Sequence, residues 1–121
     1  MGLDMFLYAE YEDGTDAEVA YWRKANAIHN WFVDAVQGGK DDCNRYPVTR
    51  DQLKALISDC KSVLDDPANA RLVLPTVSGF FFGSTEYDYG YFEDLRDTVS
   101  MLEKALADAN YGSQFFYQSS W

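Results

Sequence analysis

The stretch Ser78-Gly-Phe-Phe-Phe-Gly-Ser-Thr-Glu-Tyr-Asp88 predicts a strand near the middle of the fold that leads into a helix. Side chains of a strand alternate between its two faces, so the adjacent phenylalanines cannot all enter one core. The strand must then be covered on both faces, or keep one face for a ligand or a partner. The hydroxyl and carboxylate groups of Ser84, Thr85 and Glu86 follow it. They would line a pocket if one exists there.

The N-terminal part of the chain predicts one strand and one long helix. Residues 3–11 are rich in apolar and aromatic side chains, and Gly14 ends this strand. Thr15 and Glu18 form the pattern of a capping box, and Gly38-Gly39 closes the helix that begins there. Two stripes at helical spacing predict that this helix packs on two sides and is central to the fold. The stripes are Tyr21, Ala25, Ile28, Phe32 and Ala35, and Val19, Trp22, Asn26, His29, Val33 and Val36.

Shorter elements complete the chain. Residues 45–48 predict a short strand, and Thr49 with Gln52 forms a second capping box. The helix that follows stops, or makes a short extra turn, at residues 65–67. Another helix follows residue 88, and residues 114–118 predict a final strand. The apolar faces of these two helices are Leu53, Leu56, Ile57, Cys60, Val63 and Leu64, and Phe92, Leu95, Val99, Leu102 and Leu106.

This order of elements predicts an α+β fold, a small, mainly antiparallel sheet with three main helices packed on it. A length of 121 residues without linker or repeat favours a single globular domain over residues 1–121. A parallel α/β sheet is the alternative. The near-alternation of strands and helices supports it, but the strands lack the Val and Ile typical of buried parallel strands.

The chain is strongly acidic, with 20 Asp and Glu against 10 Lys and Arg and a formal net charge of −10. Such a surface repels nucleic-acid phosphate and anionic lipid, so direct nucleic-acid binding is not expected. A protein partner with a basic surface is permitted. Acidity that serves only solubility is the plainer interpretation.

Little in the sequence indicates a membrane, a metal or a cofactor. No apolar run approaches the length of a membrane span, and the N-terminus lacks the pattern of a signal peptide. Cys43 and Cys60 suggest a reducing, cytoplasmic compartment, and a disulfide between them is possible but not required. One histidine and these cysteines form no zinc motif, and the paired aspartates lack the spacing of a calcium loop. No metal or cofactor is therefore expected.

A binding pocket is the sharper of two interpretations for the polar residues near the phenylalanine run. The glycines there lack the spacing and the lysine of a phosphate loop. Histidine is the side-chain type that can exchange a proton near neutral pH, and Arg23 or Lys24 would meet a phosphate while an aromatic ring stacks on a base. A histidine on an apolar helix face can equally be a satisfied core residue. The candidate binding residues are Trp22, Arg23, Asn26, His29, Ser84, Thr85, Glu86 and Tyr87; none is expected to be catalytic.

The content of aromatic residues, 17%, is too high for all of them to be interior. The candidates for exposure are Tyr8, Tyr11, Tyr87, Tyr89, Tyr91, Tyr111, Phe115, Phe116, Tyr117 and Trp121. Tyr and Trp are typical anchors of protein interfaces. Aromatic side chains in an acidic field therefore describe a binding surface better than a catalytic pocket, and a homo-oligomer interface is one use of such a surface.

The chain resembles a family of small bacteriophage and prophage proteins over nearly its whole length. The resemblance rests on the start Met1-Gly-Leu-Asp-Met5, the segment Tyr21–Phe32, Asp41-Asp-Cys43, the segment Leu74–Asp88 and the end Phe116-Tyr-Gln-Ser-Ser-Trp121. It brings no catalytic residues with it. It implies an accessory protein, in the cytoplasm of an infected bacterium, that disables or redirects host machinery.

Two functions are therefore expected. The first is a non-enzymatic protein that binds and inhibits a host factor, such as a component of antiviral defence, through protein–protein interaction. The alternative is a small-ligand protein, either a sponge for a nucleotide signal or a small hydrolase, with a pocket formed by Trp22, Asn26, His29 and residues 84–86. A structural role in an oligomer is a third possibility.

Overall fold

A computed structural model describes residues 2–79, 83–108 and 114–121. Four strands and four α-helices are assigned in these ranges. The strands are β1 (Asp4–Glu10), β2 (Asp16–Arg23), β3 (Tyr46–Val48) and β4 (Phe115–Ser120). The helices are α1 (Asn26–Ala35), α2 (Arg50–Asp65), α3 (Ala70–Val73) and α4 (Tyr89–Ala107), with a 3₁₀ turn, η1, at Pro67–Asn69.

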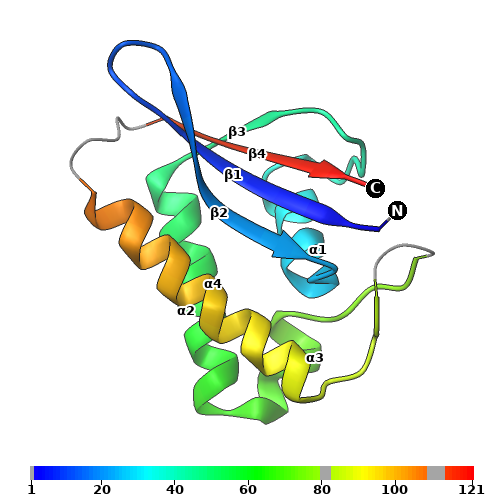
Figure 1. Cartoon of the computed structure of the whole chain (residues 1–121). Helices are drawn as coiled ribbons and strands as arrows, with labels where there is room; N and C mark the ends of the chain where they lie inside the picture. The colour runs from blue at the N-terminus through cyan, green and yellow to red at the C-terminus, as the bar shows by residue number, and fades with distance from the viewer. Residues whose placement is uncertain (1, 80–82, 109–113) are drawn as a thin grey trace.

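The strands form one antiparallel sheet in the order β2-β1-β4-β3. The helices gather on one side of this sheet (Figure 1). The α+β prediction with three main helices, α1, α2 and α4, is confirmed, and the parallel alternative is wrong because every strand pair is antiparallel.

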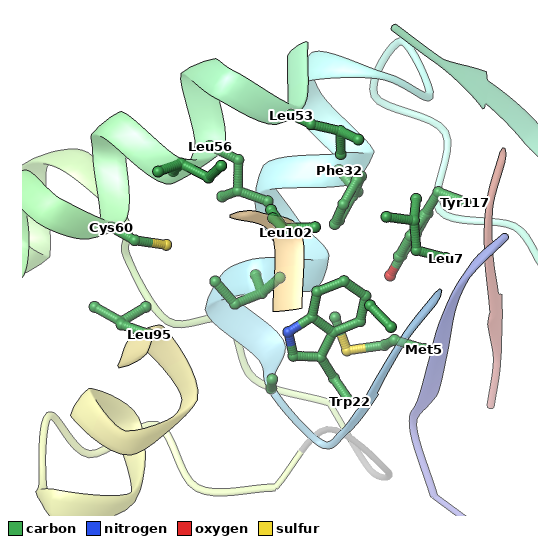
Figure 2. Close-up of a cluster of buried hydrophobic side chains, with 14 of the residues drawn as sticks. Met5, Leu7, Trp22, Phe32, Leu53, Leu56, Cys60, Leu95, Leu102 and Tyr117 are labelled. Atoms are coloured by element: carbon green, nitrogen blue, oxygen red, sulfur yellow. The ribbon is translucent and has the colours of Figure 1, made fainter. Parts of the chain in front are cut away.

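The alternation of side chains along β1 shows which face of the sheet carries the core. Met5, Leu7 and Ala9 are buried, whereas the residues between them are partly exposed. The buried face meets the helices in one continuous cluster, which includes Trp22 from the sheet and Leu95 and Leu102 from α4 (Figure 2). This face accounts for the stability of the fold, because burial of apolar surface is the main favourable term in folding.

The long helix predicted from Thr15 is wrong in its first half, which forms strand β2. Thr15 caps no helix; its hydroxyl donates to Asp13 Oδ1 at 2.6 Å in the β1–β2 turn. The register of β2 against β1 shifts between Leu7 and Tyr8, so that Val19 is the extra residue of a β-bulge. The bulge interrupts the alternation of β2, and the resulting spacing of its inward residues imitates a helix.

The helical part of that segment begins only at Asn26. Lys24, with a positive φ of 56°, turns the chain from β2 into α1. The helix ends at Ala35, close to the predicted Gly38-Gly39 stop. Buried positions of α1 include Ile28, His29 and Phe32, as its two predicted stripes require.

The strand predicted over residues 78–84 is contradicted where the structure describes it. Ser78, Gly79, Gly83 and Ser84 are exposed and irregular, and Phe80–Phe82 lie outside the described residues. The Ser84 carbonyl accepts a hydrogen bond from the Asn26 side chain instead of from a neighbouring strand. These four described residues therefore lie at the surface, and not in the middle of the fold.

Other predicted elements are confirmed. Thr49 and Gln52 form the reciprocal capping box at the start of α2. The Asp88 side chain accepts the Tyr91 N–H at 3.1 Å and caps α4. The strand at residues 45–48 is β3 and the final strand is β4.

Both cysteines are free, Cys43 exposed and Cys60 buried. Within the residues described, no helix combines the length and the apolar character that crossing a membrane requires.

Candidate functional site

A pocket of about 240 Å³ opens where β2 passes into α1. Asn26, Ser84 and Glu86, three of the residues predicted from the sequence, line it. Lys24, Asp88, Tyr91 and Asp94 are among the other lining residues. The structure thus brings together three of the eight candidate residues from distant parts of the chain, and leaves Trp22, Arg23, His29, Thr85 and Tyr87 out of the lining.

Asn26 has a structural reason to be there. Its Nδ2 donates to the Ser84 carbonyl at 2.8 Å, and its Oδ1 accepts the Val77 N–H at 3.0 Å. The side chain is buried, and it satisfies backbone groups of Val77 and Ser84, which lie in the loop between α3 and α4 and belong to no strand. Asn26 therefore holds the segment 76–88 against the start of α1.

The charge of the pocket opposes a phosphate ligand. Glu86, Asp88 and Asp94 face a single cationic lining residue, Lys24. Burial, and then the charges of Asp97, Asp88 and Glu93, raise the pKa of Asp94 to about 6. A volume near 240 Å³ also lies below the usual range for small-molecule sites, about 300–1,000 Å³.

Trp22 and Arg23 do not line this pocket. Trp22 is buried, and its Nε1 donates to Thr98 Oγ1 at 2.8 Å, which ties β2 to α4. Arg23 lies on the other side of β2 and forms an ion pair with Asp4 at 2.7 Å. The Tyr21 hydroxyl donates to the same carboxylate, and this bond together with Arg23 lowers the pKa of Asp4.

His29 lies in the core and does not reach the pocket. Its side chain is 1% exposed. Nδ1 lies 2.6 Å from the Tyr117 hydroxyl, and Nε2 lies 2.8 Å from Asp41 Oδ1. An ionised carboxylate only accepts, so Nε2–H donates to Asp41 and Nδ1 accepts from Tyr117.

The carboxylate, imidazole and hydroxyl groups follow one another in the same order as in a catalytic relay, but the hydroxyl group is buried. Tyr117 has no exposed surface, and its ring stacks on Phe32 with centroids 3.9 Å apart. Burial raises the pKa of Tyr117 well above its ordinary value. The network therefore joins α1, β4 and the segment at Asp41 and offers no nucleophile to a substrate.

Thr85 and Tyr87 serve the loop itself. Thr76 Oγ1 donates to the Thr85 carbonyl at 2.9 Å, and the Thr76 N–H donates to the Tyr87 hydroxyl at 3.2 Å. Hydrogen bonding from Thr76 lowers the pKa of Tyr87, and the Arg71 guanidinium lies over its ring. These contacts hold the two arms of the loop together.

A second candidate site is the face of the sheet turned away from the helices. Directly opposed residues on neighbouring strands share a face, and Phe6 pairs with Tyr21 while Tyr8 pairs with Phe116. The rings of Phe6 and Tyr8 stack with centroids 6.1 Å apart, and Tyr21 is 42% exposed. We call these four residues the aromatic strip.

Arg45 extends the aromatic strip toward β3. Its guanidinium lies 4.2 Å from the Phe116 ring centroid and 5.0 Å from that of Tyr8. It also forms an ion pair with Asp16 at 2.6 Å. The strip is thus a preorganised row of rings flanked by polar and acidic side chains.

The sequence argument expected exposed aromatic residues but did not find this strip. It kept Tyr8 and Phe116 as candidates for exposure, along with residues that turn out to be buried, such as Tyr91, Phe115 and Tyr117. The alternation of β1 was the available signal for Phe6 and Tyr8. Tyr111, another candidate, lies outside the described residues.

Where side-chain positions are given, no group of three or more His, Cys, Asp or Glu residues is arranged to hold a metal ion. Comparison of the chain with protein-family models, with curated proteins and with solved structures gives no match. Functional inference therefore depends on the geometry of the chain itself.

Proposed function

We propose that this protein is a non-enzymatic binding protein that docks the aromatic strip on a partner protein with a basic surface. The aromatic strip carries the proposal. One face of the sheet holds the core, whereas the other presents four aromatic side chains that no helix covers.

Rings on a sheet make good anchors because little conformational freedom is lost when they bind. Phe6 is held between Tyr8 and Tyr21, with ring centroids 6.1 and 5.4 Å away. Aromatic and Arg side chains are enriched among the residues that dominate binding energy. A partner that covers the strip would gain affinity without reorganising it.

The net charge specifies the kind of partner. A formal charge of −10 attracts a basic surface and accelerates association at low ionic strength. Near the strip, the two arginines are already paired with Asp4 and Asp16. Glu10 and Glu18 lie on the same face and form no ion pair within the described chain, so they remain available to a partner's cations.

The resemblance to bacteriophage proteins supports a partner in an infected bacterial host. Surfaces that bind nucleic acid are basic, and enzymes of antiviral defence use them. An acidic protein that covers such a surface would inhibit the enzyme. We propose this anti-defence role as the biological context of the interaction.

The small-ligand alternative has less support. The pocket at Asn26 contains neither Trp22 nor His29, and its carboxylates oppose a nucleotide phosphate. A stabilisation of the protein by any nucleotide in a thermal-shift screen would revive that alternative.

The test is a pull-down from bacterial lysate at low and high salt, followed by binding of the purified partner. We expect wild-type protein and a Tyr89→Ser variant, altered at a residue 76% exposed on α4, to bind equally. Tyr21→Ser and Phe116→Ser should weaken binding at least tenfold each, on the scale of interface anchors. Equal binding by all four proteins, or affinity independent of salt, would contradict the proposal, and a doubled mass in light scattering would instead assign the strip to a homo-oligomer.

A further inference from the structure

The edge of β2 and the neighbouring helix α4 enclose a groove that shares only Tyr21 with the aromatic strip. Tyr21, Trp22 and Arg23 form its strand side, and Asp94 and Asp97 lie on its helix side. Ser100 and Met101 complete the lining, and the volume is about 380 Å³. Figure 1 shows α4 running beside β2 on the helix side of the sheet.

The strand side offers unpaired backbone groups. β2 lies at the end of the sheet order, so one of its edges has no neighbour among the strands that the structure describes. Lys24 N–H donates to the Leu3 carbonyl at 2.7 Å, which makes this pair a hydrogen-bonded one. Such pairs alternate along an antiparallel ladder, so the N–H and C=O groups of Tyr21 and Arg23 point away from β1.

The bulge confines this free edge to a short length. Val19 interrupts the regular register, and only the segment from Ala20 onward continues without a break toward α1. Bulges and charged residues on an edge strand discourage pairing with another sheet. A short extended segment could pair with the regular part of the edge, from Ala20 onward, without crossing the bulge.

The helix side supplies negative charge. Asp94 and Asp97 stand one turn apart on α4, and neither forms an ion pair with any residue described in the structure. Burial and neighbouring carboxylates, Asp97 first among them, raise the pKa of Asp94 to about 6, in keeping with a groove wall rich in negative charge. The one cation on the strand side, Arg23, is neutralised by Asp4.

We propose that this groove binds an extended basic segment of a partner protein, which adds a strand to the edge of β2 and directs two cationic side chains at Asp94 and Asp97. Alternate side chains of a strand lie about 6.7 Å apart, close to the separation of side chains one helical turn apart. The favoured pattern is therefore Lys-Xaa-Lys or its arginine equivalent. This inference rests on the proposed function for the existence of a protein partner, and names the part of it that the groove would hold.

The test measures binding of a fluorescently labelled peptide, Thr-Lys-Val-Lys-Val-Lys-Thr, to the whole protein by anisotropy. We expect saturable binding with a Kd of about 100 µM, and protection of the Tyr21 and Arg23 amides from hydrogen exchange. Combined Asp94→Asn and Asp97→Asn substitutions should raise the Kd about tenfold. Asp65→Asn, a change of charge at the exposed end of α2, should alter it less than about twofold.

A peptide N-methylated at alternate residues separates strand pairing from simple charge attraction. It keeps every cation but loses the N–H groups that face β2, and should bind at least about tenfold more weakly. Equal affinity of the two peptides, or no binding at 1 mM, would overturn the inference. It would also be overturned if the free protein had twice the mass of one chain and returned to the mass of one chain when the peptide was added. If the peptide fails while partner binding still depends on Phe116, which lies on the strip and not in the groove, only the groove is refuted and the proposed function stands.

Discussion

Replacing Tyr117 by phenylalanine removes one oxygen atom from the centre of the protein, and we expect it to destabilise the fold measurably. The hydroxyl lies 2.6 Å from His29 Nδ1, and both residues are buried. Because Nε2–H is committed to Asp41, Nδ1 is the acceptor in this bond. The substitution therefore takes a hydrogen bond away from a buried acceptor.

The expected loss is about 2 kcal/mol in the free energy of unfolding, the middle of the range for an acceptor left unsatisfied in a core. The ring itself stays, and with it the stack on Phe32, whose plane is inclined by 5° to that of Tyr117. Lost packing should consequently add little. Tyr46→Phe is the matched control, because its hydroxyl bonds to Asp42 in a partly exposed position and should contribute less than about 1 kcal/mol.

Urea unfolding monitored by tryptophan fluorescence measures both variants. With a denaturant slope of about 1.5 kcal/mol/M, Tyr117→Phe should lower the midpoint by roughly 1.3 M. The ¹⁵N shifts of His29 should also change, because its ring loses one of its bonds. A midpoint shift no larger than that of Tyr46→Phe would refute the assignment of this hydroxyl to a structural network.

Three further outcomes follow from other parts of the chain. Asp94 has a raised pKa, so the native state binds its proton more tightly than the unfolded state, and its contribution to stability should fall as pH rises from about 4 to 6. Asp94→Asn should flatten that slope and stabilise the protein at pH 7 by about 1 kcal/mol after allowance for solvent screening, as measured by urea unfolding across pH. Cys43 is exposed and should react with a thiol reagent in the native protein. Burial raises the pKa of Cys60 to about 12, so this thiol should react only when the protein unfolds. Mass spectrometry should therefore find one label before urea is added and two labels after. Gly83→Ala should destabilise by about 1–2 kcal/mol in thermal unfolding, because φ is +84° there and a Cβ would lie 2.9 Å from Lys24 Cβ; an unchanged Tm would show that the loop adjusts.

Elements with a complete local signal were predictable. The start of α2 follows from Thr49 and Gln52, since both halves of a capping box lie in adjacent sequence. Helix α4 follows from the apolar spacing that includes Leu95 and Leu102, both buried as expected. The alternation along β1 identifies Phe6 and Tyr8 as sharing one face, but not whether a helix covers that face.

Strand β2 could not be predicted, because its local sequence favours a helix. Ala17, Glu18 and Ala20 are good helix formers, and the bulge at Val19 breaks the alternation that would mark a strand. Pairing with β1 overrides this preference. The same pairing separates Trp22 from Asn26, which a continuous helix would have placed on one stripe.

Only some of the residues that line the candidate pocket were predictable, because the others depend on contacts between distant parts of the chain. Ser84 and Glu86 lie beside Asn26, as expected from their polarity at the start of a helix. His29 stays on α1 but turns into the core toward Tyr117, a residue distant in sequence. Contacts between residues that are distant in sequence produce no pattern in the local sequence, so they could not be predicted from it.

The sequence by itself determined the composition of the surface and the local elements: the acidity, the excess of aromatic rings, the caps of α2 and α4, and the alternation of β1. Each depends on residues within a few positions of one another, so short-range chemistry suffices. The tertiary structure alone decided that residues 16–23 are a strand, that Gly79 and Gly83 belong to no strand, and that the helices gather on one face of the sheet. These outcomes depend on which segments pair and pack, and only the free energy of the whole fold selects among them.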